Sequence, residues 1–322
     1  MTARSGDDGP PADPPAPPDR QRREPLPWCQ PKPADEDPDA PGRVAAIMAH
    51  PAYRQADRDT GFLAGDSTRG VRLELDYAKA ELLLAQAGVE RTVVVFGSTR
   101  IREPATAARR VAGLRALVAA HPGDADAARR LAIAERLHAK SHYYDMARDF
   151  GRLVGEAWDA GPGLVLMTGG GPGIMEAANR GAWEAGAPTI GLNIALPEEQ
   201  YPNPYITPGL CFSFHYFALR KLHFLKRACA LVAFPGGYGT FDEVFETLTL
   251  VQTRKIEPVP VVLVGADYWR RVVAIDALVD EGVIDAEDRD LFWFAESAGE
   301  AWEGIRAWHA RAGRPLTGAA PG

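Results

Sequence analysis

Two glycine-rich segments have the residue types and spacing suited to binding a phosphate. They are Thr168–Glu176 (TGGGPGIME) and Pro235–Glu243 (PGGYGTFDE), and each follows a short apolar run and precedes a helical pattern. Glycine permits positive φ and lets a ligand approach the backbone closely. The helix that follows directs unpaired N–H groups and its positive dipole end at the same place. Both segments are therefore candidate phosphate-binding loops.

Each segment alone is a weak signal, because tight strand–helix junctions need glycine in any case. Neither is a Walker A loop, since no Gly-Lys-Ser or Gly-Lys-Thr follows, and the first lacks the acidic ribose ligand of a dinucleotide site. Two such segments at the carboxyl ends of two strands in one sheet indicate a crevice. We expect this crevice to hold one phosphorylated ligand.

A basic helical pattern, Phe214–Arg227, lies between the two glycine segments. Its apolar residues, such as Phe217 and Leu222, can pack against a core, while Arg220 and Lys221 are expected to point away from that core. Taken alone, the pattern favours an amphipathic helix with solvated charges. Because the helix directly precedes the strand of the second glycine segment, Arg220 and Lys221 become candidates for contact with an anionic ligand.

The elements that must position these residues alternate along the chain. Five apolar runs with helical patterns between most of them are expected to be strands: Thr92–Phe96, Leu164–Met167, Thr189–Leu192, Ala230–Phe234 and Val259–Val264. Continuous apolar runs fit strands that are covered on both faces. The alternation predicts an α/β fold, with a Rossmann-like, doubly wound and mostly parallel sheet that carries helices on both faces.

The remaining segments suggest a domain order. Residues 1–42 hold twelve of the 27 prolines and lack apolar periodicity, so we expect a disordered tail. Residues 43–90 are expected to form an N-terminal helical cap, and 91–316 the nucleotide-binding catalytic domain, before a flexible C-terminus at 317–322. Within residues 91–316, the segment 105–141 is predicted to be an inserted helical hairpin that breaks at Pro122-Gly123-Asp124. Asp124 would cap the second arm, which is expected to continue towards Trp158.

The composition excludes several classes of protein. The formal charge of −7 argues against a general nucleic-acid binder, since phosphate backbones are bound by clustered Lys and Arg. No apolar run approaches the roughly 20 residues that span a bilayer, and the N-terminus has no apolar signal core. We therefore expect a cytoplasmic protein that does not contact membranes or nucleic acid.

Metal and disulfide chemistry are not indicated. Cys29, Cys211 and Cys229 form no CxxC pair, and the last two are expected to be buried in core strands. His138 and His142 share a helix face, but no third ligand is evident nearby. The sequence predicts no metal site.

The stretch from Thr92 to about Trp269 resembles the Lonely Guy (LOG) superfamily, whose members are often mislabelled lysine decarboxylases. The family's arginine–lysine pair matches Arg220-Lys221, and its PGGxGTxxE motif matches the second glycine segment. Phe96-Gly97-Ser98 and Gly169–Asn179 fit the family's first loop and glycine stretch. The residues before Arg220, Tyr216–Leu219, depart from the Met-His-Glu of the plant-type enzymes, which weakens the case for a cytokinin base.

The resemblance implies hydrolysis of a nucleoside 5′-monophosphate to a free base and ribose 5-phosphate, with Arg220 and Glu243 catalytic. It implies no cofactor and no metal, and we expect a homo-oligomer, a dimer or larger. The expected phosphate- and nucleotide-binding residues come from the three loops and the basic helix: Gly97, Ser98, Gly169, Gly170, Gly171, Gly173, Lys221, Gly236, Gly237, Gly239 and Thr240.

The chemistry of the reaction agrees with these roles. Cleaving an N-glycosidic bond builds positive charge on the ribose, as in other oxocarbenium-like glycoside chemistry, and a nearby carboxylate stabilises it or orients water. Glu243 is expected in the first turn of the helix that holds the 5′-phosphate. The alternative is a purely structural role, in which the carboxylate interacts with the helix dipole. The rival function is a non-catalytic carrier of a nucleotide or a molybdopterin-type cofactor, which has no use for an intact Arg220 and Glu243 pair.

Overall fold

A computed structural model describes residues 24, 26, 29–158, 163–196, 201–314 and 316. The chain divides into two units, Met1–Arg69 and Gly70–Gly322. The first unit contains the helices α1 (Ala40–Ala49) and α2 (Thr60–Ala64), with three short 3-10 turns at Pro51–Tyr53, Ala56–Arg58 and Asp66–Thr68. The expected tail falls mostly outside the described residues, as does the expected C-terminal segment 317–322.

A seven-stranded parallel sheet forms the centre of the second unit, in the order β4-β3-β2-β1-β5-β6-β7. Its strands are β1 (Arg91–Phe96), β2 (Leu164–Thr168), β3 (Thr189–Ile194), β4 (Cys211–Phe214), β5 (Ala228–Ala233), β6 (Val261–Val264) and β7 (Trp293–Ala295). The five predicted strands are all present. The doubly wound α/β fold is thus confirmed.

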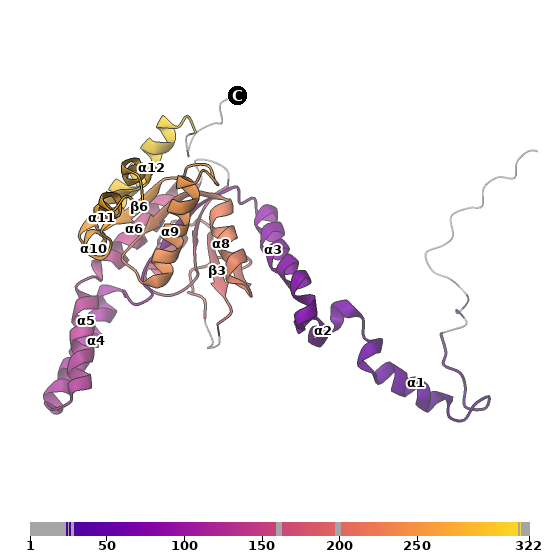
Figure 1. The fold of residues 1–322 in the computed structure, drawn as a ribbon. Coiled ribbons are helices and arrows are strands. Elements are labelled where there is room, and N and C mark those ends of the chain that lie inside the picture. The colour runs from indigo at the N-terminus through magenta and orange to yellow at the C-terminus, as the bar shows by residue number, and fades with distance from the viewer. Residues whose placement is uncertain are drawn as a thin grey trace, which may run out of the picture. The chain divides into compact units, whose positions relative to one another are not determined.

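Helices cover both faces of this sheet (Figure 1). The remaining helices of the chain are α3 (Arg69–Gln86), α4 (Pro104–Ala120), α5 (Ala125–His138), α6 (His142–Glu156), α7 (Ile174–Glu184), α8 (Phe217–Lys226), α9 (Tyr238–Gln252), α10 (Ala266–Val272), α11 (Ile275–Asp280) and α12 (Ala298–Arg311). In the described part of the chain, none is both long and apolar enough to cross a membrane. A further 3-10 helix spans Ala286–Leu291.

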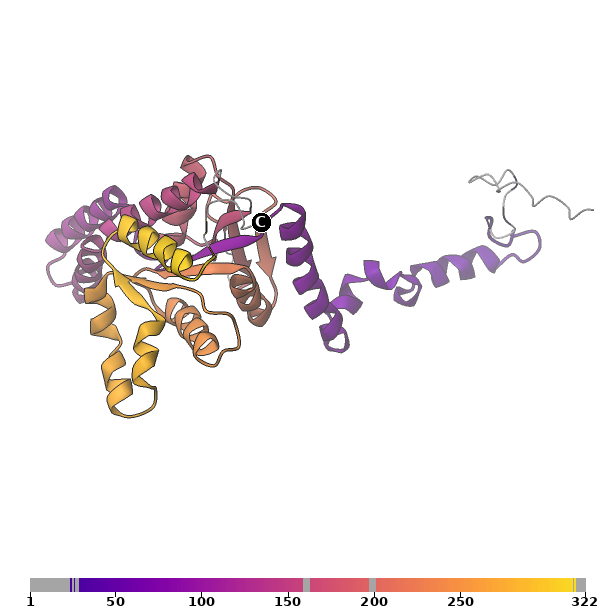
Figure 2. The same ribbon diagram turned by 90° about the horizontal axis from the view of Figure 1, so that it is seen from above.

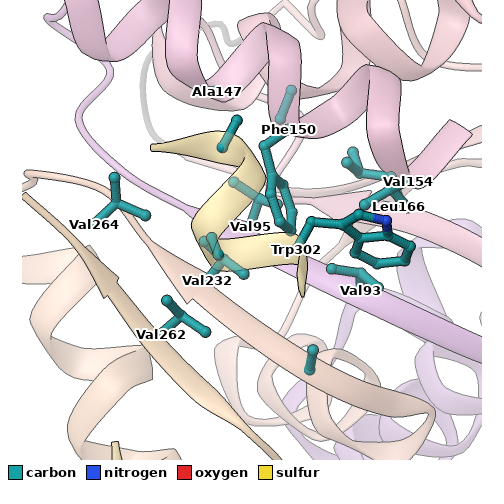
Figure 3. Packing of buried hydrophobic residues seen from close by; sticks show 14 of the residues in the cluster. Val93, Val95, Ala147, Phe150, Val154, Leu166, Val232, Val262, Val264 and Trp302 are labelled. Carbon is teal, nitrogen blue, oxygen red and sulfur yellow. The ribbon is translucent and has the colours of Figure 1, made fainter. Parts of the chain in front are cut away.

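The two faces of β1 divide the core. Val93 and Val95 point into one cluster, where Phe150 of α6 meets Trp302 of α12 edge to face with ring centroids 6.3 Å apart (Figure 3). Val94 points to the opposite cluster, which α3, α8 and α9 cover. Successive strand residues point to opposite faces, so an unbroken apolar strand lets the sheet bury both sides.

The inserted hairpin is formed by α4 and α5, which project from the sheet (Figure 1; Figure 2 gives the view from above). It has its own small core, in which Val111 and Leu114 meet Ala134. The predicted cap is confirmed: the Asp124 side chain accepts a hydrogen bond from the Ala127 amide at 2.9 Å. The prediction of one continuous second arm is wrong, because α5 ends at His138 and α6 begins at His142.

The cysteine assignment needs one correction. Cys229 is buried in β5, as expected, but Cys211 is exposed. Cys211 begins β4, an edge strand whose residues alternate between exposed and buried. An edge strand lacks a neighbour on one side, so part of its surface stays open to solvent.

Candidate functional site

A cleft of about 670 Å³ opens at the carboxyl ends of the central strands. The loops after β1 and β5 supply much of its wall, and these are the strands at which the chain order of the sheet reverses. Ligands of open α/β sheets bind at such switch points. The lining residues that the following paragraphs use are Gly97, Ser98, Arg100, Leu137, Lys140, Gly169, Met175, Phe217, Arg220, Gly236, Gly237, Tyr238, Gly239, Thr240, Asp242 and Glu243.

The second glycine segment makes the N-terminus of α9. Gly237 is the residue that precedes the helix, and its carbonyl accepts hydrogen bonds from the amides of Thr240 and Phe241. Among the described residues, the amides of Tyr238 and Gly239 have no acceptor, as the first turn of a helix dictates. The cleft therefore contains amides that can hold an anion.

Gly236 is required here for space. A Cβ built on it would lie 2.0 Å from Thr240 Oγ1, so only glycine lets the loop pack against the first turn of α9. The Tyr268 hydroxyl donates a hydrogen bond to the Gly236 carbonyl and so fixes the loop from the other side.

The first glycine segment contributes less than expected. Of its glycines only Gly169 lines the cleft. The carbonyls of Gly170 and Gly171 accept hydrogen bonds from Asn203, at 2.8 and 3.1 Å. Gly173 has φ of +75° and lies so close to Ser98 that a Cβ would be 2.4 Å from the Ser98 carbonyl oxygen. These three glycines shape the loop and do not line the cleft, whereas the start of α9 lines it with amides that have no acceptor among the described residues.

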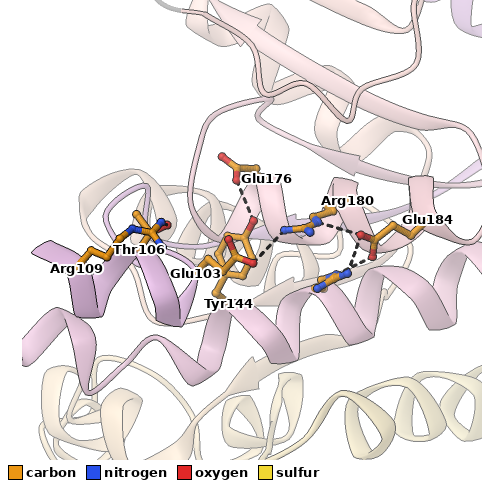
Figure 4. Close-up of polar contacts among 8 residues, drawn as sticks. Glu103, Thr106, Arg109, Tyr144, Glu176, Arg180 and Glu184 are labelled. Carbon is orange, nitrogen blue, oxygen red and sulfur yellow. Dashed lines mark hydrogen bonds and ion pairs between the residues drawn. The ribbon is translucent and has the colours of Figure 1, made fainter.

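A polar network fixes the start of α7 beside the cleft (Figure 4). The Tyr144 hydroxyl donates to Glu176 Oε1 at 2.8 Å. Arg180, one turn further along α7, reaches Glu103 at 3.3 Å and Glu184 at 2.9 Å. Glu176 follows Met175, which lines the cleft, so the network holds the wall of the cleft against α6 and the loop before α4.

Arg220 is fixed by three contacts. Its Nε donates to the Leu192 carbonyl at 2.7 Å, and its guanidinium lies over the rings of Phe224 and Phe217, with 5.0 and 5.9 Å to the ring centroids. Burial lowers the pKa of Arg220, although Glu243 and Asp242 act in the opposite direction. Arginine remains charged in proteins, so the cleft contains one oriented, partly desolvated cation.

Glu243 is only 5% exposed, and burial raises the pKa of its carboxyl to about 7. The positive charges of Lys221 and Arg220 oppose this rise. The expected place in the first turn is wrong, because α9 begins at Tyr238 and Glu243 is its sixth residue. The helix dipole acts mainly on the terminal turn, so a dipole contact does not account for a carboxyl at this depth.

Lys221 does not line the cleft. Its Nζ lies 2.8 Å from Asp242 Oδ2 and 2.8 Å from Glu246 Oε2, both on α9. Adjacent residues on a helix point in different directions, so Arg220 enters the cleft while Lys221 turns towards α9. The structure gives Lys221 two carboxylate partners in place of the expected anion.

Two cations of the cleft were not predicted from the sequence. Arg100 follows the first loop and Lys140 lies between α5 and α6. Arg100 carried a weak signal, since it lies three residues after Gly97. Lys140 carried none, because only the folded hairpin brings it near the glycine loops. In the described ranges, no group of three or more His, Cys, Asp or Glu side chains could hold a metal.

The chain is similar in sequence to known proteins. A family model described as "Possible lysine decarboxylase" matches residues 175–305. The probable cytokinin riboside 5′-monophosphate phosphoribohydrolase LOG4 of Oryza sativa subsp. japonica is 34% identical over 142 residues, which are 42% of this chain and 60% of the rice protein. The cytokinin riboside 5′-monophosphate phosphoribohydrolase LOG3 of Arabidopsis thaliana is 32% identical over 166 residues, 50% of this chain and 73% of that protein.

A solved structure titled as a Moco carrier protein from Chlamydomonas reinhardtii is 20% identical, covers 69% of this chain and 99% of its own, and has a TM-score of 0.41. A likeness this distant says nothing about function. The sheet and the cleft define an α/β protein with a crevice at the carboxyl ends of its central strands. The chain belongs to the Lonely Guy (LOG) family.

Proposed function

We propose that this protein hydrolyses the N-glycosidic bond of nucleoside 5′-monophosphates and releases the free base and ribose 5-phosphate. One observation carries the proposal: Arg220 and Glu243 line the same cleft as the N-terminal amides of α9. The names of the plant relatives, which are phosphoribohydrolases of a nucleoside 5′-monophosphate, support it.

The phosphate is proposed to bind at the amides of Tyr238 and Gly239. Glu243 follows Tyr238 by five residues, which corresponds to about 7.5 Å along the helix axis. That separation suits a phosphate at the helix end and a ribose beside the carboxyl. With its pKa raised to about 7, Glu243 can both carry negative charge and exchange a proton near neutral pH.

In this arrangement the ionised Glu243 stabilises the positive charge that develops on the ribose, and it orients the attacking water. Arg220 directs its guanidinium into the same cleft and orients the departing base or the sugar. In this proposal the backbone amides at the start of α9 hold the phosphate, while Arg220 and Glu243 act at the glycosidic bond.

The test is incubation of the purified protein with a panel of nucleoside 5′-monophosphates and the matching nucleosides, followed by detection of free base. We expect the monophosphates to be cleaved and the nucleosides not, since phosphate binding energy is used in the transition state. Equal turnover of both would contradict the phosphate site. An inactive protein that binds a nucleotide or a pterin tightly would favour the carrier alternative.

A further inference from the structure

A second cavity, of about 540 Å³, lies between the loop after β1 and the inserted hairpin. It is lined by Arg100, Arg102, Thr106, Ala107, Arg110, Ile133, Ala134 and Leu137, and we call it the arginine pocket. Its wall combines three guanidinium groups with an apolar side from α5, and it contains no acidic residue. Its size lies within the usual range for small-molecule sites, about 300–1,000 Å³.

The charges of the arginine pocket are not neutralised by the protein. Among the described residues, no ion pair involves Arg100, Arg102 or Arg110. Other arginines of the same hairpin are paired, since Arg115 binds Glu135 and Arg129 binds Asp126. A chain with a net charge of −7 thus leaves three positive charges around one cavity. Such a cavity attracts an anion.

The arginine pocket adjoins the cleft, because Arg100 and Leu137 line both cavities. A ligand anchored in the cleft can therefore extend into the pocket. Arginine suits phosphate in particular, since its planar guanidinium can donate two parallel hydrogen bonds to the phosphate oxygens.

We propose that the arginine pocket binds a second phosphate group. The shared wall favours a second phosphate on the same ligand, so a nucleoside 5′-monophosphate that carries a further phosphate should bind more tightly than one without it. This substrate class rests on the proposed function, but phosphate binding itself does not. A separate phosphate-bearing ligand is the other source, and the experiment distinguishes the two.

The test uses the double variant Arg102→Ala/Arg110→Ala, whose residues line the arginine pocket and not the cleft. The matched control is Arg129→Ala/Arg130→Ala, which removes the same charge from α5 and lies outside both cavities. Calorimetry measures the affinities for adenosine 5′-monophosphate, adenosine 5′-diphosphate, adenosine 3′,5′-bisphosphate and inorganic pyrophosphate. Calorimetry reports binding whether or not the protein turns these ligands over.

We expect the pocket variant to lose at least 10-fold in affinity for a nucleotide with two phosphates and less than 2-fold for the monophosphate, while the control keeps the wild-type values. If a separate ligand fills the pocket, pyrophosphate binds to the protein at the same time as the monophosphate. Only the pocket variant then loses the binding of pyrophosphate. Equal affinities of all three proteins for every ligand with two phosphates would overturn the proposal. Binding without hydrolysis would overturn the proposed function alone.

Discussion

The guanidinium of Arg220 occupies the space that a side chain on Gly169 would need. A Cβ built on Gly169 would lie 2.6 Å from Arg220 Nη2 and 3.0 Å from Met175 Sδ. Gly169 does not adopt positive φ, so its small size and not its backbone freedom is what the site requires. The end of β2 and the helix α8 thus meet at Arg220, the member of the Arg220-Lys221 pair that lines the cleft.

Replacing Gly169 by alanine is therefore expected to displace Arg220 from the cleft. We expect the kcat/KM for a nucleoside 5′-monophosphate to fall at least about 10-fold, since small misplacements of a positioned group are costly. The melting temperature should change little, because the arginine side chain can move. Gly113→Ala on α4 is the control: its Cβ meets nothing within 4 Å, so this variant should keep full activity. Wild-type kinetics in Gly169→Ala would show that the position of Arg220 is unimportant.

Glu243→Gln tests the carboxylate. The amide keeps the size and removes the charge, so kcat should fall by about 10²-fold or more. Arg220→Ala should lose activity similarly, and the double variant should be little worse than either single one, because groups that act together are non-additive. Steady-state kinetics on the three variants checks this. An active Glu243→Gln protein excludes the mechanism.

Glu243→Gln is expected to lower kcat but to raise the stability of the folded protein above neutral pH. The carboxyl of Glu243 has a folded pKa of about 7, above its ordinary value of 4.5, so the folded state binds more protons between these values. Stability therefore falls as the pH rises from about 4.5 to about 7, by up to roughly 3 kcal/mol, and then stays level. Glu243→Gln lacks this loss, and its melting temperature should exceed that of the wild type at pH 8 but not at pH 4.5. A constant difference across this range would contradict the raised pKa.

The sequence was sufficient for the fold where the strands are buried on both sides. Val93, Val94 and Val95 form an unbroken apolar run because helices cover both faces of β1. It was insufficient at the edges of the sheet, where β4 has only two buried residues and β7 has three residues in all. Short edge strands carry too little apolar pattern to be distinguished from loops.

The residues of the site were also predicted only in part from the sequence. Glycine spacing located the α9 N-terminus and Gly169, because close packing at Gly236 and Gly169 leaves no room for a side chain. It could not distinguish Gly169, which makes room for Arg220, from Gly170, whose carbonyl binds Asn203. Nor could it place Lys140, since its approach to the cleft depends on how the hairpin folds back.

A second stability prediction concerns the contact between α3 and α8. Glu81 binds Arg227 at 2.8 Å and Lys226 at 2.9 Å, and the hydrogen bond from Arg227 is the main reason that the pKa of Glu81 falls from 4.5 to about 2. A carboxyl with a lowered pKa stabilises the fold above pH 4.5, and this contribution is lost as the pH falls towards 2.

Glu81→Gln should therefore lower the free energy of unfolding by about 1–3 kcal/mol at pH 7, as expected for a charge-assisted pair that is partly buried. Glu303→Gln is the control, because Glu303 forms an exposed pair with Arg306 and such pairs contribute little. Urea denaturation of both variants at pH 7 and pH 3 gives the comparison. Equal stabilities of the two variants at pH 7 would show that the ion pairs of Glu81 with Arg227 and Lys226 do not stabilise the fold.

Lys221 offers the sharpest test of how the site works, because its two roles predict different kinetics. Among the charges that lower the pKa of Glu243, Lys221 has the largest effect, and it also neutralises Asp242 and Glu246 nearby. Lys221→Met removes that charge, so the pKa of Glu243 should rise. If the ionised form of Glu243 is the active one, the acid limb of kcat/KM moves to higher pH, while the rate above the limb changes little.

A lysine that held the substrate phosphate would behave differently. Its loss would raise KM for a nucleoside 5′-monophosphate at every pH and leave the limb at about pH 7, the pKa of Glu243. Lys79→Met, at an exposed position of α3, controls for the loss of one positive charge and should leave the profile unchanged. Measuring kcat/KM from pH 5 to pH 9 separates the cases. If the acid limb of kcat/KM does not shift and KM rises, Lys221 binds the substrate phosphate. That result would contradict its assignment as the partner of the α9 carboxylates.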